Sequence, residues 1–170
     1  FVKAAEIGTK KVIKEHSTIG IVVTTDGSVA DIERRSYEES EQRVVSEMKD
    51  LGKPFVILLN SAHPDDPETE AIRVNIEEKY GVTCIAINCL EVKEEEIVGI
   101  LHSLLCEFPL YEFGVFLPPW VDALPMEHSI KSNLYAAIRE SARNVEKVRD
   151  IERYVTLMQC CDGISAAKVR

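Results

Sequence analysis

The sequence predicts an α/β fold, in which a mostly parallel sheet carries helices on both faces in a three-layer arrangement. Runs rich in β-branched residues at 19–25, 55–59 and 82–87 are almost continuously apolar, which is typical of strands covered on both sides. Stretches with the three- and four-residue spacing of amphipathic helices alternate with these runs. Because neighbouring parallel strands need a crossover connection, usually a helix, the alternation predicts a parallel sheet.

The first two helices are predicted from apolar spacing and from end signals. Residues 2–16 are expected to be helical because apolar positions recur there at spacings of three and four. The next helix is expected to begin at Ser36, where Glu39 completes a capping box, and to end at Gly52, its C-terminal glycine. Its predicted buried stripe consists of Tyr37, Val44, Met48 and Leu51.

Two further helices are predicted before residue 108. Asp66 followed by Pro67 is a helix start, and Gly81 is the matching stop. The inner face of that helix is predicted to hold Ile72, Ile76 and Tyr80. A last helix covers about 94–107, and its predicted inward residues are Ile97, Ile100, Leu101, Leu104, Leu105 and Phe108.

The chain is expected to change character after residue 108. We therefore divide it into a first domain, 1–108, and the start of a second, middle domain, 109–170. Several prolines interrupt the beginning of the second part. A helical or mixed segment with one long amphipathic helix at about 128–158 is predicted to follow.

Composition excludes several classes of protein. The formal net charge of -9 argues against free-standing nucleic-acid binding, which needs a basic face. No apolar run reaches the roughly 20 residues of a membrane span, and no signal peptide is evident. Five cysteines without Cys-x-x-Cys spacing and four scattered histidines predict free thiols in a reducing cytoplasm and no metal site. The first residue is Phe1, which suggests a fragment of a longer chain.

The loops that follow the predicted strands are the candidate ligand site, because open parallel sheets bind ligands at the carboxyl ends of their strands. These loops begin at Thr25 with Asp26, at Asn60 and at Asn88. A Gly-x-x-x-x-Gly-Lys-Ser/Thr phosphate loop and an Asp-x-x-Gly magnesium motif are both absent. The chain as given is therefore expected to bind nucleotide weakly or not at all.

The second loop, 60–63, occupies the position where guanine-nucleotide switch proteins carry Asn-Lys-x-Asp. Ser61 replaces the lysine that packs over the base, and His63 replaces the aspartate that accepts hydrogen bonds from guanine. A neutral histidine cannot supply two acceptor oxygens, so guanine selectivity would be lost. The alternative is that Asn60 only caps the strand and turns the loop. At Asn88 the match to a base-backing turn is weak, and a plain turn is favoured.

Arg34 lies beyond the carboxyl end of the first strand, on the side of the loops. An arginine there could reach a phosphate, or the phosphate of a neighbouring subunit, as a bidentate donor. The alternative is a solvated loop charge.

Several stretches together resemble the stage IV sporulation protein A family. They are residues 6–13, 16–28, 53–61, 63–64 with 67–71, and 118–121. The resemblance implies the second half of a P-loop, GTPase-like domain of the translation-factor-related class that uses ATP and Mg²⁺. The phosphate loop and the magnesium aspartate would then lie upstream of Phe1. Arg34 falls on the family's arginine, whereas Arg35 departs from its usual acidic residue.

The same resemblance implies a role in building the spore coat. ATP hydrolysis in the full-length parent would drive self-assembly into the basement layer of the coat. That layer would form on the outer forespore membrane, inside the mother-cell cytoplasm. Spore-coat proteins and a small amphipathic membrane peptide would bind through regions outside this chain. The alternative function is a non-catalytic assembly module that keeps the switch-like fold. This chain by itself is expected to expose a strand edge and to self-associate.

Overall fold

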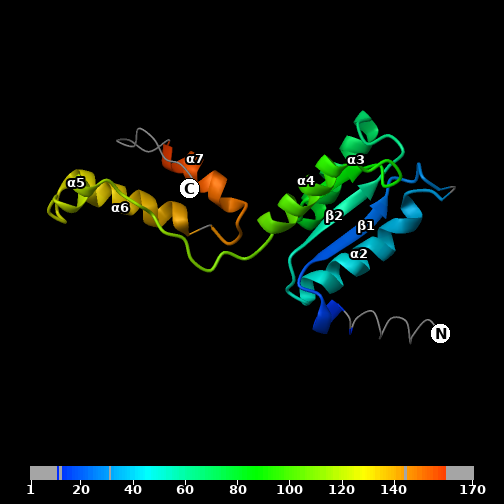
Figure 1. Ribbon diagram of the computed structural model, residues 1–170, viewed down its shortest axis with the longest axis horizontal. Helices are drawn as coiled ribbons and strands as arrows, with labels where there is room; N and C mark the ends of the chain where they lie inside the picture. The colour runs from blue at the N-terminus through cyan, green and yellow to red at the C-terminus, as the bar shows by residue number, and fades with distance from the viewer. Residues whose placement is uncertain (1–10, 12, 31, 144, 160–170) are drawn as a thin grey trace. The chain divides into compact units, whose positions relative to one another are not determined.

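The computed structural model describes residues 11, 13–30, 32–143 and 145–159 (Figure 1). The chain divides into two compact units between Glu107 and Phe108, and each is described by itself. Lys11 and residues 13–16 are helical, as predicted for 2–16, and the rest of that predicted helix lies outside the described residues. No described helix combines the length and the hydrophobicity that a membrane span requires.

The first unit contains a three-stranded parallel sheet in the order β1-β2-β3 (Figure 1). Its strands are β1 (Gly20–Thr25), β2 (Phe55–Asn60) and β3 (Cys84–Ile87). The helices α2 (Arg35–Asp50), α3 (Pro67–Tyr80) and α4 (Glu94–Cys106) alternate with the strands along the chain. The predicted α/β fold with a parallel sheet is therefore confirmed.

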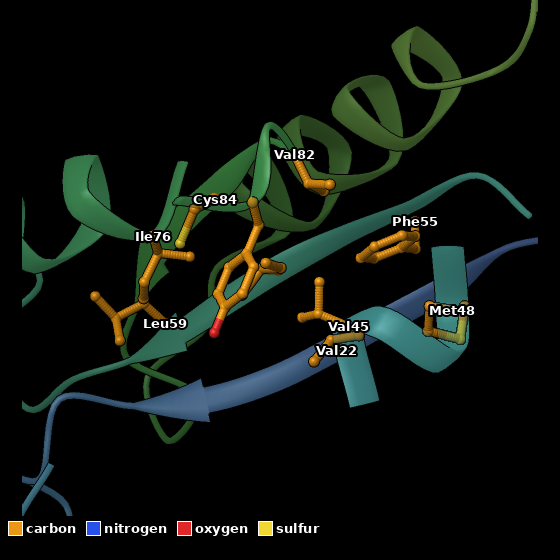
Figure 2. Close-up of a cluster of buried hydrophobic side chains, with 10 residues drawn as sticks. Val22, Val45, Met48, Phe55, Leu59, Ile76, Val82 and Cys84 are labelled. Atoms are coloured by element: carbon orange, nitrogen blue, oxygen red, sulfur yellow. The ribbon is translucent and has the colours of Figure 1, made fainter. Parts of the chain in front are cut away.

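Apolar clusters lie on both faces of the sheet, centred on β2. Because side chains alternate along β2, Ile57 and Leu59 join one cluster, whereas Val56 and Leu58 join the other. Figure 2 shows the first cluster, in which α2 and α3 pack on the sheet. The second cluster adds Ile100 and Leu104 of α4. Helices thus lie on both faces, as the alternating sequence predicted.

The predicted end signals of α3 are confirmed. Asp66 is its N-cap residue, Pro67 opens it, and Gly81 ends it in the left-handed region at a φ of 62°. Ile76 and Tyr80 are buried as predicted, and Ile72 packs at the edge of the first cluster.

The predicted start of α2 is wrong, and its predicted buried face is confirmed only at Met48. The backbone is already helical at Arg34, and no side chain caps the helix, so Ser36 and Glu39 form no capping box. The buried residues are Glu41, Val45 and Met48, whereas Val44 is exposed. The buried face of the helix includes a charged side chain, Glu41, which a stripe chosen from apolar residues alone leaves out.

The predicted inward face of α4 is too wide. Ile100 and Leu104 are buried, whereas Ile97, Leu101 and Leu105 are exposed. The helix lies over β2 and does not cover the same face of β1, where Ile21 and Val23 are exposed as well. The width of an apolar stripe on a helix therefore does not predict how many of its residues are buried in the fold.

The second unit contains α5 (Pro119–Asp122), α6 (Ser129–Ala142) and α7 (Asp150–Gln159). The single helix predicted at about 128–158 is wrong, because the chain leaves the helical path between α6 and α7. Backbone hydrogen bonds join 108–110 to 146–148 there. The Asp150 carboxylate also accepts hydrogen bonds from the N–H groups of Glu146 and Lys147. The apolar stripe is thereby folded back, and α6 and α7 pack against each other.

We expect this chain to self-associate through β1. Within the described residues, the outer edge of β1 pairs with no strand, and a groove of about 470 Å³ runs along it beside α2. An unpaired edge with exposed apolar side chains favours pairing with another chain. Size-exclusion chromatography with light scattering should show concentration-dependent oligomers. Val23→Lys should reduce them, and Leu90→Lys, at an exposed leucine away from the edge, should not. A wild-type monomer at every concentration would contradict this expectation.

Candidate functional site

The carboxyl ends of the three strands meet at one edge of the sheet and bring most of the predicted site residues together. Thr25 is the register partner of Asn60. The Asp26 N–H donates to the carbonyl of Asn60 at 3.4 Å, and the Ser61 N–H donates to the carbonyl of Ile87 at 3.0 Å. Residues predicted from separate loops are therefore brought together at this edge.

Asn60 and Asn88 organise the loops after β2 and β3. The Asn60 Oδ1 accepts from the Cys89 N–H at 3.0 Å, so this side chain ties the second loop to the third. The Asn88 Oδ1 accepts from the Leu90 N–H at 3.0 Å and turns its own loop. The predicted contacts of these residues with a nucleotide stay predictions, whereas their roles within the loops are visible.

Asp26 is the centre of a cluster of hydroxyl groups. Its Oδ1 accepts from the Ser28 N–H at 2.8 Å and from the Ser28 Oγ at 2.6 Å. Its Oδ2 accepts from the Thr69 Oγ1 at 3.3 Å. Burial alone would raise the pKa of Asp26, but the hydrogen bonds from Ser28 and the other hydroxyls of the cluster outweigh it and lower the pKa. The carboxylate is therefore ionised at neutral pH.

Ser61 and His63 differ in how much of each residue is exposed. Ser61 is fully buried, and its hydroxyl lies 3.3 Å from the Thr69 Oγ1 and accepts from the His63 N–H at 2.9 Å. The His63 side chain is exposed. Of the two replaced motif positions, His63 is therefore the one whose side chain can meet a ligand directly, and Ser61 shapes the loop from within.

Arg34 is not a solvated loop charge, because its guanidinium is held by neighbouring side chains. Its Nη1 lies 2.6 Å from Glu41 Oε2 and donates to the Thr24 Oγ1 at 2.9 Å. Tyr80 donates to the other oxygen of Glu41 at 3.0 Å. A phosphate-directed role stays a prediction, and the Nη1 atom would be available for it only if Arg34 left this network.

Glu41 was missed by sequence reasoning, although the sequence holds a signal for it. It lies four and seven residues before Val45 and Met48, on the face that helical spacing would bury. Burial alone would raise the pKa of this carboxyl, but hydrogen bonds from Arg34 and Thr24 and the charge of Arg34 outweigh it, so the pKa is lowered. A charged residue within an apolar stripe indicates a buried partner, and here the partner is Arg34.

The polar groups at the strand ends differ in whether they are already engaged within the protein. The His63 side chain is exposed, whereas Arg34 is engaged by Glu41. The N–H groups of the loops after β2 and β3 donate to side chains within the protein: Ala62, His63, Cys89 and Leu90. Within the described part of the chain, no three His, Cys, Asp or Glu side chains gather closely enough to hold a metal ion. Groups that bind the phosphates and Mg²⁺ are therefore not assigned to any residue of this site.

Family models match the whole chain in two consecutive parts. Residues 1–109 match the ATPase domain of Stage IV sporulation protein A, and residues 110–170 match its middle domain. No solved structure matches the chain significantly.

Individual relatives agree with these models. The chain is 50% identical to Stage IV sporulation protein A of Clostridioides difficile (strain 630) over 152 residues, which are 89% of this chain and 31% of that protein. It is 43% identical over 155 residues to the proteins of the same name from Bacillus subtilis (strain 168) and Bacillus anthracis, with 91% of this chain and 32% of each relative covered. The chain thus spans about a third of the length of these relatives, and it belongs to the Stage IV sporulation protein A family.

Proposed function

We propose that this chain is part of a longer sporulation protein that hydrolyses ATP with Mg²⁺ and uses the energy to assemble. The observation that carries the proposal is the match of residues 1–109 to an ATPase domain, with the strand-end loops gathered at one edge of the sheet. Such an edge is where open parallel sheets bind their ligands. The whole protein would polymerise into the basement layer of the spore coat.

The proposed setting follows from the same family membership. The polymer would lie on the outer forespore membrane, on the side of the mother-cell cytoplasm. Spore-coat proteins and a small amphipathic membrane peptide would bind through other regions of the full-length protein. Membership of a sporulation family supports this setting.

Within the full-length protein, this chain would contribute the surface that meets the base. No phosphate-loop motif occurs in its sequence, so another segment would hold the phosphates. His63 stands where a guanine-reading site has a carboxylate. Guanine presents donors at N1 and N2, and a neutral imidazole has only one acceptor nitrogen for them. The proposed substrate is therefore ATP and not GTP.

We expect ATP to bind in preference to GTP, and only when the phosphate loop is present. Calorimetry with Mg²⁺ should detect no binding to this chain alone. A chain extended upstream, or the full-length protein, should bind ATP more tightly than GTP. Preferential binding of GTP by the full-length protein would contradict the choice of ATP.

A His63→Asp variant makes the same measurement sharper. The new carboxylate offers acceptors for guanine, and a hydrogen bond to a charged group contributes about 1.5–3 kcal/mol, so GTP affinity should rise roughly tenfold or more. His102→Asp is a matched control, because His102 is also exposed but lies on α4, away from the strand ends. Equal effects of the two variants would mean that His63 does not face the base.

The self-contained hydrogen bonding of the site supports a second candidate function. Arg34 is bound by Glu41, and the Ser61 hydroxyl is bound within the Asp26 cluster. Loops whose polar side chains bond to one another and not to a ligand would suit a non-catalytic assembly module. Failure of both the extended chain and the full-length protein to bind nucleotide would favour this function over an ATPase.

A further inference from the structure

Two hydrogen-bonded paths lead from the Asp26 carboxylate to consecutive backbone N–H groups of the loop after β2. The first path runs from Oδ1 to the Ser28 Oγ at 2.6 Å, which accepts from the Ala62 N–H at 2.8 Å. The second runs from Oδ2 to the Thr69 Oγ1 at 3.3 Å, on to the Ser61 Oγ at 3.3 Å, and to the His63 N–H at 2.9 Å. One side chain after β1 therefore fixes the backbone of a loop that follows another strand.

The negative charge of Asp26 sets the direction of both paths. An ionised carboxylate can only accept hydrogen bonds, so Ser28 and Thr69 must turn their protons toward it. Their lone pairs are then left to accept, Ser28 from the Ala62 N–H and Thr69 from the Ser61 hydroxyl. Ser61 in turn accepts from the His63 N–H. The lowered pKa of Asp26 agrees with this arrangement.

Burial holds the second path in place, and the backbone of the first loop fixes the residue from which both paths start, whereas Ser28 of the first path is exposed. Ser61 and Thr69 are buried at 0% and 3% exposure, so water competes little for their hydroxyls. Gly27 adopts a φ of 96°, and a Cβ there would lie 3.1 Å from the backbone N of Arg34. This turn therefore requires glycine, and it fixes the position from which Asp26 reaches the cluster.

We propose that Asp26 is a positioning residue for segment 61–63, and that it sets the selectivity for the nucleotide base by fixing where His63 lies. The inference rests on the proposed function, because it takes this segment as the part that meets the base. Asp26 does not need to touch the nucleotide, since both of its oxygens are engaged by donors from Ser28 and Thr69. Its effect reaches the ligand through the loop.

The first test is Asp26→Asn in the full-length protein, with the kinetics of ATP and GTP hydrolysis measured side by side. One end of the amide is a donor, so it must reverse or break one of the two paths. A misplaced binding segment should raise KM for ATP by roughly tenfold to a hundredfold and lower the ratio of ATP to GTP kcat/KM, with kcat largely unchanged. Asp65→Asn is the matched control, because Asp65 is an exposed acid in the same region and lies outside the cluster.

Variants of Thr69 test the inference even if Asp26→Asn does not fold. Thr69→Val removes the hydroxyl from the second path at nearly constant volume and should weaken selectivity in the same direction. Thr69→Ser keeps the hydroxyl, so its selectivity between ATP and GTP should match that of the wild type. A role of Thr69 in packing alone would not predict this difference between the two variants. Amide hydrogen exchange gives a readout that needs no nucleotide: the Ala62 and His63 N–H groups should exchange faster in Asp26→Asn than in the wild type.

The outcomes separate this inference from the proposed function. An active wild type together with folded Asp26→Asn and Thr69→Val variants of unchanged KM and base preference would overturn the positioning role alone. A fall in kcat with unchanged KM would also overturn it, because it would place Asp26 in the chemical step. A wild-type protein that neither binds nor hydrolyses ATP would overturn the proposed function, and the proposed effect on selectivity with it.

Discussion

Glu41→Ala is expected to lower the free energy of unfolding by about 3 kcal/mol, near the lower end of the cost of breaking a buried ion pair. The Glu41 side chain is 2% exposed and lies 2.6 Å from Arg34, which is 17% exposed. Without the carboxylate, Arg34 keeps its charge with limited access to water, and Tyr80 loses the acceptor of its hydroxyl. Urea unfolding followed by circular dichroism would measure the loss.

The matched control for this experiment lies on the same helix. Glu39 is exposed, so Glu39→Ala should change stability by no more than about 0.5 kcal/mol. Adding Arg34→Ala to Glu41→Ala should cost less than the sum of the two single changes, because each change removes the same ion pair. Equal losses for Glu39→Ala and Glu41→Ala would show that the network contributes nothing to folding.

The same network gives a distinct response to acid. The pKa of Glu41 is lowered from its usual 4.5, so folding is stabilised above that pH, and the contribution disappears as the pH falls through the lowered value. Asp26 has its own lowered pKa and contributes with the same sign from its usual 3.8 downward. In Glu41→Gln the free energy of unfolding should fall less on acidification than in the wild type, because the contribution from Glu41 is absent at every pH. An unchanged acid profile would contradict the assignment.

Leu104→Ala is expected to destabilise the first unit by about 2–5 kcal/mol, because it opens a cavity beneath α4. Leu104 is 1% exposed and belongs to the cluster that α4 forms with β2. Its neighbour Leu105 is 61% exposed, so Leu105→Ala should change the free energy of unfolding by no more than about 0.5 kcal/mol. Denaturant unfolding of both variants at low protein concentration would measure the difference.

Comparison of the two leucines isolates the effect of burial. The residue type, the helix and the change in helix propensity are the same in both variants, so only the surroundings of the side chain differ. A loss at Leu105 equal to that at Leu104 would contradict the described packing of α4. It would mean that another surface covers the outer face of this helix.

The sequence alone determined the layout of the first unit. Three apolar runs separated by amphipathic stretches predicted a parallel sheet with helices on both faces, and Asp66, Pro67 and Gly81 predicted the limits of α3. These features depend on backbone preferences and on spacing within a few residues, which local sequence contains in full. The loops that hold Asn60 and Asn88 could be predicted for the same reason, since each follows directly from the end of a strand. The expected cover on both sides of the first run was wrong, because Ile21 and Val23 are exposed.

Only the tertiary structure decided which side chains meet. Glu41 is buried because Arg34, Thr24 and Tyr80 surround it, and the helix predicted at 128–158 is broken because 108–110 bonds to 146–148. The inward turn of Ser61 depends in the same way on Thr69 and Asp26. Each of these outcomes joins residues that are far apart or on different elements, and its energy comes from burial and hydrogen bonding that exist only once the chain has folded. A local pattern can indicate that a residue is polar or apolar, but the partner it finds is a property of the fold.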